Sequence, residues 1–120
     1  MSLPHALHAH RHDTENRAMI TLTGEVDLDS APLIRETLGR CLLDGIRTID
    51  VDLTAVSFCD CSGINAFLAV ALRTTEAGGV LRLHHPAPAV ARVFALTGSA
   101  ALLPDEPAAV PVPGPAARAA

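Results

Sequence analysis

The spacing of apolar residues changes from a period of two to a period of about 3.6 between residues 49 and 72. Ile49, Val51 and Leu53 alternate with polar residues, which is typical of a strand with one buried face. From residue 64 onward the apolar positions follow the spacing i, i+3, i+4, i+7, i+8, which predicts an amphipathic helix. Its expected buried face consists of Ile64, Phe67, Leu68, Ala71 and Leu72. The pattern therefore predicts a strand that leads into a helix, with residues 60–63 at the junction.

The segment before residue 24 predicts a β-hairpin. Residues 7–12 and 18–23 alternate in polarity on either side of a polar turn at residues 13–16. Gly24 is expected to end the second of these strands.

A first helix is expected after the hairpin. Asp29 or Ser30 is expected to cap it, and Pro32 lies in its first turn, where a missing N–H costs little. Gly45 is expected to end it, because glycine readily adopts the left-handed conformation found after helices. The residues predicted on its buried face are Ile34, Leu38, Cys41 and Leu42.

The segment after the central helix predicts one more strand and one short helix. The central helix is expected to run to the glycine pair at residues 78–79, and a strand is expected over residues 80–84. Pro86 and Pro88 are expected to open the last helix, which stops near Gly98. The residues expected to point inward are Leu81 and Leu83 on the strand and Val90, Val93 and Phe94 on the helix.

The element order β-β-α-β-α-β-α predicts a single α/β domain over residues 1–103. Because its strands have one polar face, we expect a small mixed sheet of four to five strands with helices packed mainly on one face. Residues 104–120 are rich in proline and alanine and have no apolar period, so a disordered tail is predicted there. A proline-rich docking peptide in this tail stays open as an alternative.

Composition excludes several function classes. The net charge of −4 and the lack of any Lys/Arg cluster argue against nucleic-acid binding. No stretch is long and apolar enough to cross a membrane, and the first residues do not resemble a signal peptide. The three cysteines are expected to be free thiols in a reducing cytoplasm, with Cys59 in the core and Cys61 near the surface. The aromatic residues Phe58, Phe67 and Phe94 are all expected to be buried.

Ser62 is the main candidate for chemistry, because it stands where the central helix begins. Its hydroxyl either caps the helix or carries a phosphate, which the positive end of the helix dipole favours. A serine hydrolase is a rival interpretation, but Asp60 occupies the first glycine position of the Gly-x-Ser-x-Gly motif. The histidines His5, His8, His10 and His12 predict at most adventitious metal affinity, since no acidic residue is placed to complete a site. We therefore expect no catalytic residue, no metal and no cofactor.

Two stretches resemble signatures of the STAS domains of bacterial anti-sigma factor antagonists. Val56–Ile64 resembles a strand end followed by Phe-x-Asp-Ser-Ser-Gly-Leu, and Leu22–Asp27 resembles the upstream Gly-Glu-Leu-Asp. The resemblance covers roughly residues 5 to 103 and implies a STAS-like fold. Cys61 and Asn65 depart from the family, which often has serine and glycine at these positions.

By this resemblance, the chain is not an enzyme but the substrate of one. The unphosphorylated form would bind an anti-sigma factor with GHKL-type serine kinase activity and so release a sigma factor. Phosphorylation of Ser62 would dissociate this complex, and a PP2C-type phosphatase would restore the unphosphorylated form. The partner-binding residues implied are Gly24, Glu25, Asp27, Asp60, Cys61, Ser62, Gly63 and Asn65. Among them Asp27 and Asp60 would orient the site.

Other interpretations stay open. The chain is also compatible with a STAS scaffold subunit that does not switch, either in a stress-sensing complex or beside a lipid transporter. A weak homodimer stays open as well.

Overall fold

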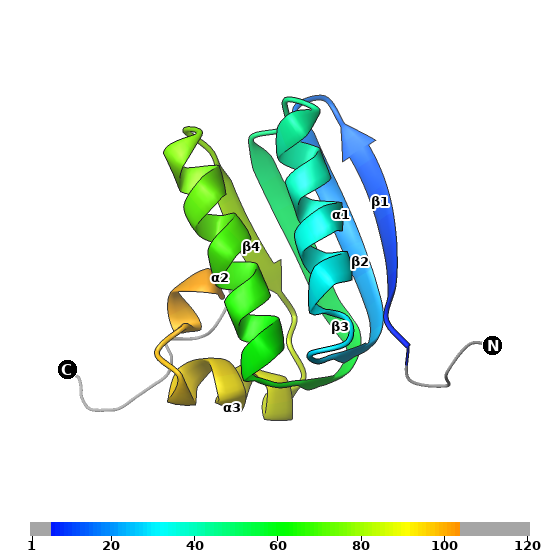
Figure 1. Ribbon diagram of the computed structural model, residues 1–120, viewed down its shortest axis with the longest axis vertical. Coiled ribbons are helices and arrows are strands. Elements are labelled where there is room, and N and C mark those ends of the chain that lie inside the picture. Colours follow the sequence, from blue (N-terminus) through cyan, green and yellow to red (C-terminus); the bar gives the residue numbers. More distant parts are fainter. Residues whose placement is uncertain (1–5, 104–120) are drawn as a thin grey trace.

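Four strands form one sheet, and two long helices lie side by side on one of its faces (Figure 1). The structure is a computed structural model that describes residues 6–103. Its elements are β1 (His8–Thr14), β2 (Arg17–Val26), α1 (Ala31–Leu43), β3 (Thr48–Cys59), α2 (Cys61–Glu76), β4 (Val80–His84), α3 (Pro88–Leu96) and a short 3-10 helix, Ala100–Leu102. The predicted fold class and element order are confirmed. The tail predicted at residues 104–120 lies outside the described residues.

The sheet has the order β1-β2-β3-β4 and is mixed. Strands β1 and β2 pair antiparallel, whereas β2–β3 and β3–β4 pair parallel, with α1 and α2 as the connections. The hairpin turn is shorter than predicted, because Thr14 already pairs with Arg17. Only Glu15 and Asn16 remain in the turn, and Glu15 adopts a left-handed conformation with φ 55°.

Strand β2 does not end at Gly24, as the sequence suggested, but continues to Val26. Gly24 pairs with Val56 of β3 and has φ +120°, a conformation that favours glycine. A side chain at Gly24 would lie 2.5 Å from the carbonyl oxygen of Ala6. The register against β3 shifts on both sides of this glycine, so it forms an irregularity inside the strand and not its end.

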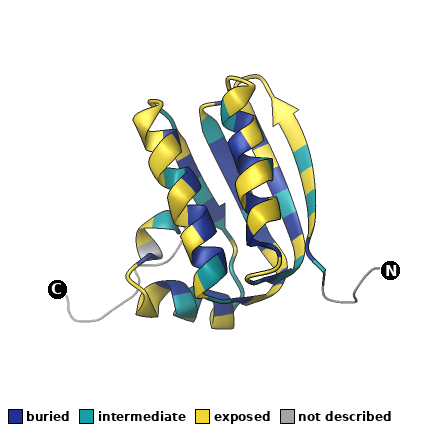
Figure 2. Cartoon of the chain, in the orientation of Figure 1, coloured by how far each residue is buried: buried dark blue, intermediate teal, exposed yellow. Residues whose placement is uncertain are grey.

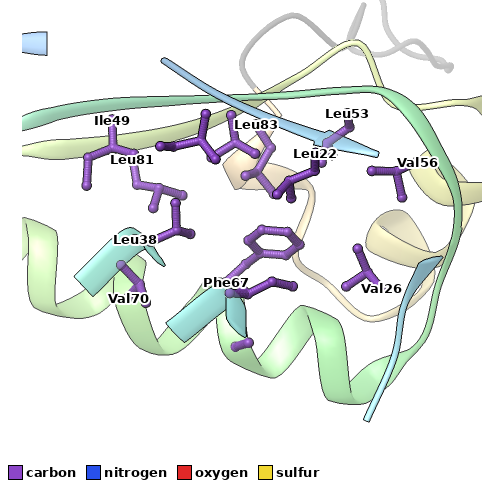
Figure 3. Close-up of a cluster of buried hydrophobic side chains, with 14 of the residues drawn as sticks. Leu22, Val26, Leu38, Ile49, Leu53, Val56, Phe67, Val70, Leu81 and Leu83 are labelled. Atoms are coloured by element: carbon purple, nitrogen blue, oxygen red, sulfur yellow. The ribbon is translucent and has the colours of Figure 1, made fainter. Parts of the chain in front are cut away.

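The core lies between the helices and the inner face of the sheet (Figure 3). Alternate residues of β2, β3 and β4 point into it, including Leu81 and Leu83 as predicted. On α1 the predicted face is confirmed for Ile34, Leu38 and Cys41, while Leu42 is half-buried. The ring centroids of Phe67 and Phe94 lie 6.2 Å apart, so these two aromatic side chains join α2 to α3 in the core.

The predicted buried face of α2 is partly wrong. Leu68 is 39% exposed and Leu72 is 61% exposed. Ile64 and Phe67 are buried as predicted, and the other buried residues of the helix are Gly63, Ala66, Val70 and Thr74. Helix α2 packs against both the sheet and α1, so small residues let it approach closely, and Thr74 satisfies its buried hydroxyl by donating to the Val70 carbonyl oxygen at 2.7 Å. Figure 2 shows the resulting exposed side of α2.

Phe58 was also predicted to be buried, yet its side chain is 46% exposed. The register shifts near Gly24 disturb the alternation of β3. Val56 and Cys59 therefore face the core, and Phe58 between them does not.

Candidate functional site

The start of α2 lies against the end of β2, and Asp60 holds this junction from two sides. Its backbone N–H donates to the Val26 carbonyl oxygen at 3.1 Å. Its carboxylate Oδ1 accepts from the backbone N–H of Gly63 at 3.1 Å, so Asp60 is the N-cap residue of α2. The predicted hydrogen bond from a helix N–H to Asp60 is confirmed. The alternative in which Ser62 caps the helix is wrong.

Ser62 is the second residue of α2 and is half-buried. Its hydroxyl makes no hydrogen bond to any residue in the part of the chain that the structure describes. Within residues 6–103, no group accepts from the backbone N–H of Cys61 or Ser62. The helix start therefore offers a serine hydroxyl beside two N–H donors at the positive end of the helix dipole, an arrangement suited to a phosphate.

The residue after Ser62 must be glycine, because a side chain there would overlap with β2 and β3. A Cβ atom at Gly63 would lie 2.1 Å from Cγ1 of Val26 and 3.3 Å from Sγ of Cys59. At Gly63, helix α2 thus lies so close to Val26 of β2 that no side chain fits between them.

The two cysteines on either side of Asp60 differ as predicted. Cys59 is buried and Cys61 is exposed. Burial, followed by the neighbouring charge of Asp60, raises the pKa of the Cys59 thiol to about 12. Cys59 is therefore a core residue, and Cys61 lies on the surface directly before Ser62.

The second sequence motif lies beside the first, as the resemblance implies. Glu25 pairs with Phe58, and Val26 pairs with Cys59, in the parallel register of β2 and β3. The hydroxyl of Ser57 donates to the Gly24 carbonyl oxygen at 3.5 Å. The β2 motif therefore lies beside the end of β3, which leads directly into α2.

Asp27 serves the entry into α1. Its Oδ1 accepts from the Ser30 backbone N–H at 3.0 Å, and its own N–H donates to Ser30 Oγ at 2.9 Å. Ser30 occupies the N-cap position of α1, but its side chain makes no cap hydrogen bond, and its hydroxyl lies 3.1 Å from the Glu25 carbonyl oxygen. Ser30 thus holds the predicted N-cap position, but its side chain does not cap the helix, because Asp27 and Ser30 bind each other instead.

The sequence missed the apolar residues around this surface. Leu28, between β2 and α1, is 70% exposed, and Phe58 flanks the site on β3. On α2, the exposed residues Cys61, Asn65, Leu68 and Leu72 form a row at helical spacing. Leu28 lies between two aspartates and outside any periodic segment, so only its hydrophobicity could have signalled it. Exposed apolar side chains beside a polar helix start are suited to binding another protein.

The structure gives the histidines no place near Ser62. His8, His10 and His12 share the outward side of β1, and His5 lies outside the described residues. In the described part of the chain, no three His, Cys, Asp or Glu side chains are placed to hold a metal ion. Among residues 6–103, no helix is long and apolar enough to span a bilayer.

Comparisons with known proteins agree with this fold. A family model described as "Mlab, STAS domain" matches residues 9–104. The anti-sigma-B factor antagonist of Bacillus subtilis (strain 168) is 31% identical over 84 residues, which cover 70% of this chain and 76% of that protein.

Solved structures are similar over most of their length. An anti-sigma factor antagonist from Mycobacterium paratuberculosis has a TM-score of 0.74 at 24% identity, over 87% of this chain and 88% of that chain, a likeness of fold. The anti-sigma factor antagonist SpoIIAA in its unphosphorylated form has a TM-score of 0.69 at 28% identity, over 82% of this chain and 85% of that chain. The Bacillus cell fate determinant SpoIIAA in its phosphorylated form has a TM-score of 0.64 at 25% identity, over 82% of this chain and 88% of that chain.

Proposed function

The chain belongs to the STAS domain family, and we propose that it is an anti-sigma factor antagonist that phosphorylation of Ser62 switches off. It acts in the cytoplasm as a regulatory binding protein and not as an enzyme. Its similarity to the anti-sigma-B factor antagonist and to SpoIIAA supports the partner class. That SpoIIAA is known in both an unphosphorylated and a phosphorylated form supports the switch.

The observation that carries the proposal is the state of the Ser62 hydroxyl. It stands at the second position of α2 without a hydrogen bond to a described residue, while Asp60 does the capping. A kinase can therefore modify it without removing a contact that holds the fold. The added phosphate carries about −1.5 to −2 charges, and the N–H groups of the first turn and the helix dipole stabilise it in place. Phosphorylation thus changes the charge of the surface and leaves the domain folded.

The partner surface consists of the first turn of α2 and the adjoining end of β2. It includes Gly24, Glu25, Asp27, Asp60, Cys61, Ser62, Gly63 and Asn65, the residues implied by sequence, and the exposed Leu28 and Phe58. The apolar side chains supply buried area in the complex, and Ser62 lies beside them as the switch. The partner is an anti-sigma factor with GHKL-type serine kinase activity, and a PP2C-type phosphatase removes the phosphate. In this surface Asp60 positions the first turn of α2, and Asp27 positions the loop that enters α1.

Displacement of a sigma factor tests this function directly. Each GHKL-type anti-sigma factor encoded in the same genome is loaded with its sigma factor, starting with any encoded beside this chain. The unphosphorylated chain is expected to bind one of them and release the sigma factor in a stoichiometric titration. If none binds, the proposal is refuted, and a STAS scaffold subunit without a switch is the alternative to test.

A further inference from the structure

A hollow of about 540 Å³ lies on the face of the sheet opposite α1 and α2, which we call the outer face. The strand pairing places one row of residues across it: His12 pairs with Met19, Met19 with Asp50, and Asp50 with Arg82. These four residues line the hollow, as do Arg17 and His84. Ser62 and the partner surface belong to helix α2 and the end of β2, and do not line it. The volume is in the range of small-molecule sites, roughly 300–1,000 Å³.

The floor of the hollow is a carboxylate that is buried although no long helix covers it. The Asp50 side chain is only 8% exposed. Its Oδ1 lies 2.7 Å from His84 Nε2 and 3.1 Å from Arg82 Nε, and its Oδ2 lies 3.4 Å from Arg17 Nε. Burial alone would raise the pKa of Asp50, but the hydrogen bond from His84 and the positive charges of Arg82 and Arg17 outweigh it and hold the pKa below its usual value. Asp50 is thus ionised and fixes both arginines over the sheet.

Both arginines contact Asp50 through Nε, which leaves their terminal nitrogens unused. In the described part of the chain, neither Arg17 nor Arg82 donates a hydrogen bond from a terminal nitrogen. A guanidinium group has five N–H donors, four of them on the terminal nitrogens. Arg17 comes from β2 and Arg82 from β4, so they approach Asp50 from the two strands on either side of β3.

Apart from its histidines, the hollow contains two arginines and two aspartates, so its formal charges balance. Asp50 offsets one of the two arginine charges. The other carboxylate, Asp52, accepts from the Thr54 backbone N–H at 3.0 Å and from its hydroxyl at 2.6 Å. His12 and His85 also line the hollow. Paired terminal nitrogens of arginine match the oxygens of a phosphate or carboxylate group.

We propose that this hollow binds a small organic anion through a phosphate or carboxylate group held by the terminal nitrogens of Arg17 and Arg82. The hollow is larger than one such group needs, so the rest of the molecule lies along the Met19 side chain, which is 40% exposed. The site lies away from Ser62 and requires no phosphorylation of the chain.

The test is a titration of the full chain followed by ¹H–¹⁵N NMR at constant ionic strength, maintained with chloride. The probes are inorganic phosphate, glucose 6-phosphate and citrate, which separate a free phosphate, an organic phosphate and a carboxylate ligand. At least one organic probe is expected to shift the signals of Arg17 and Arg82, including their side-chain Nε–H, and to saturate. Arg17→Gln is expected to weaken its binding at least about tenfold.

Arg17→Gln is the main variant because Arg17 makes the longest contact to Asp50 and its loss leaves His84 and Arg82 in place. Arg82→Gln is the second variant, checked for folding by circular dichroism. Arg92→Gln, an exposed arginine on α3, is the matched control and is expected to bind as the wild type does. Shifts that do not saturate, or equal affinities for Arg17→Gln and Arg92→Gln, would overturn the proposal.

Discussion

Replacing Gly63 with alanine tests whether α2 must lie directly against β2. The Cβ of alanine would stand 2.1 Å from Cγ1 of Val26, which is itself fully buried. An ordinary contact needs at least about 3.4 Å, so either the helix start or Val26 must move by more than 1 Å. The hydrogen bond between the Asp60 N–H and the Val26 carbonyl oxygen limits that movement.

The expected loss follows from two opposing terms. Overpacking a core position costs about 1–3 kcal/mol, and the severe overlap at Gly63 places it near the upper end of that range. Alanine in a helix gains at most about 1 kcal/mol over glycine. Gly63→Ala is therefore expected to lower the free energy of unfolding by about 2 kcal/mol. For a domain of this size that corresponds to a fall in Tm of roughly 6–12 °C.

Gly39→Ala provides the matched control. Gly39 is also a buried glycine within a helix, but its added Cβ would meet only the guanidinium group of Arg73, with Nη1 at 3.2 Å. The end of a flexible side chain can move at little cost, so Gly39→Ala is expected to be neutral or up to about 1 kcal/mol more stable than the wild type. Urea unfolding followed by far-UV circular dichroism measures both variants. If Gly63→Ala is as stable as Gly39→Ala, the close packing of α2 on β2 described here is wrong.

Three further predictions concern the cap, the outer face and the tail. Asp60→Ala is expected to lower the free energy of unfolding by about 1 kcal/mol and to slow phosphorylation of Ser62. Asp60→Asn keeps an acceptor for the Gly63 N–H and is expected to retain most of the stability. Equal urea midpoints and equal phosphorylation rates for the wild type and both variants would show that Asp60 does not cap α2 in this way. Because the pKa of Asp50 is lowered in the folded chain, its contribution to stability is complete above the unfolded pKa of about 3.9 and is lost as the pH falls through the lower folded value. Between pH 6 and pH 2, the Tm of Asp50→Asn is therefore expected to fall less steeply than the Tm of the wild type. Parallel curves of Tm against pH would contradict this. A chain that ends at Leu103, which is buried, is expected to keep the Tm and the kinase binding of the full chain, and calorimetry that finds a large drop in Tm would show that residues 104–120 belong to the folded domain.

Much of the fold follows from local sequence signals. Strand β4 has the predicted bounds, because Leu81 and Leu83 alternate with polar residues between a glycine pair and a proline. The signature at the start of α2 located Asp60 and Ser62 correctly, since capping depends on neighbours within one turn. These features need no knowledge of the partner elements.

The errors arise where a distant element decides the burial of a residue. Leu68 and Leu72 are more hydrophobic than Gly63 and Ala66, yet the small residues are buried because β2 and α1 approach α2 there. Asp50 follows the polar half of a strand pattern, and its burial depends on Arg82 and His84, which stand more than 30 residues away in the sequence. No periodicity within β3 could signal this contact.

The phosphorylation site and its effect on binding test the central claim most directly. The wild-type chain and Ser62→Ala are incubated with the cognate kinase and ATP, the phosphate is located by mass spectrometry, and the affinity for the kinase is then measured. Against one partner carboxylate about 6 Å away, at an effective dielectric near 40, a phosphate is repelled by roughly 2.5 kcal/mol, a loss of about 50- to 100-fold in affinity.

The account predicts phosphate on Ser62 alone, the stated loss of affinity for the phosphorylated chain, and a Ser62→Ala variant that takes no phosphate and binds as the unphosphorylated wild type does. Phosphate on Ser57 or on a threonine, or unchanged affinity after phosphorylation of Ser62, would contradict it.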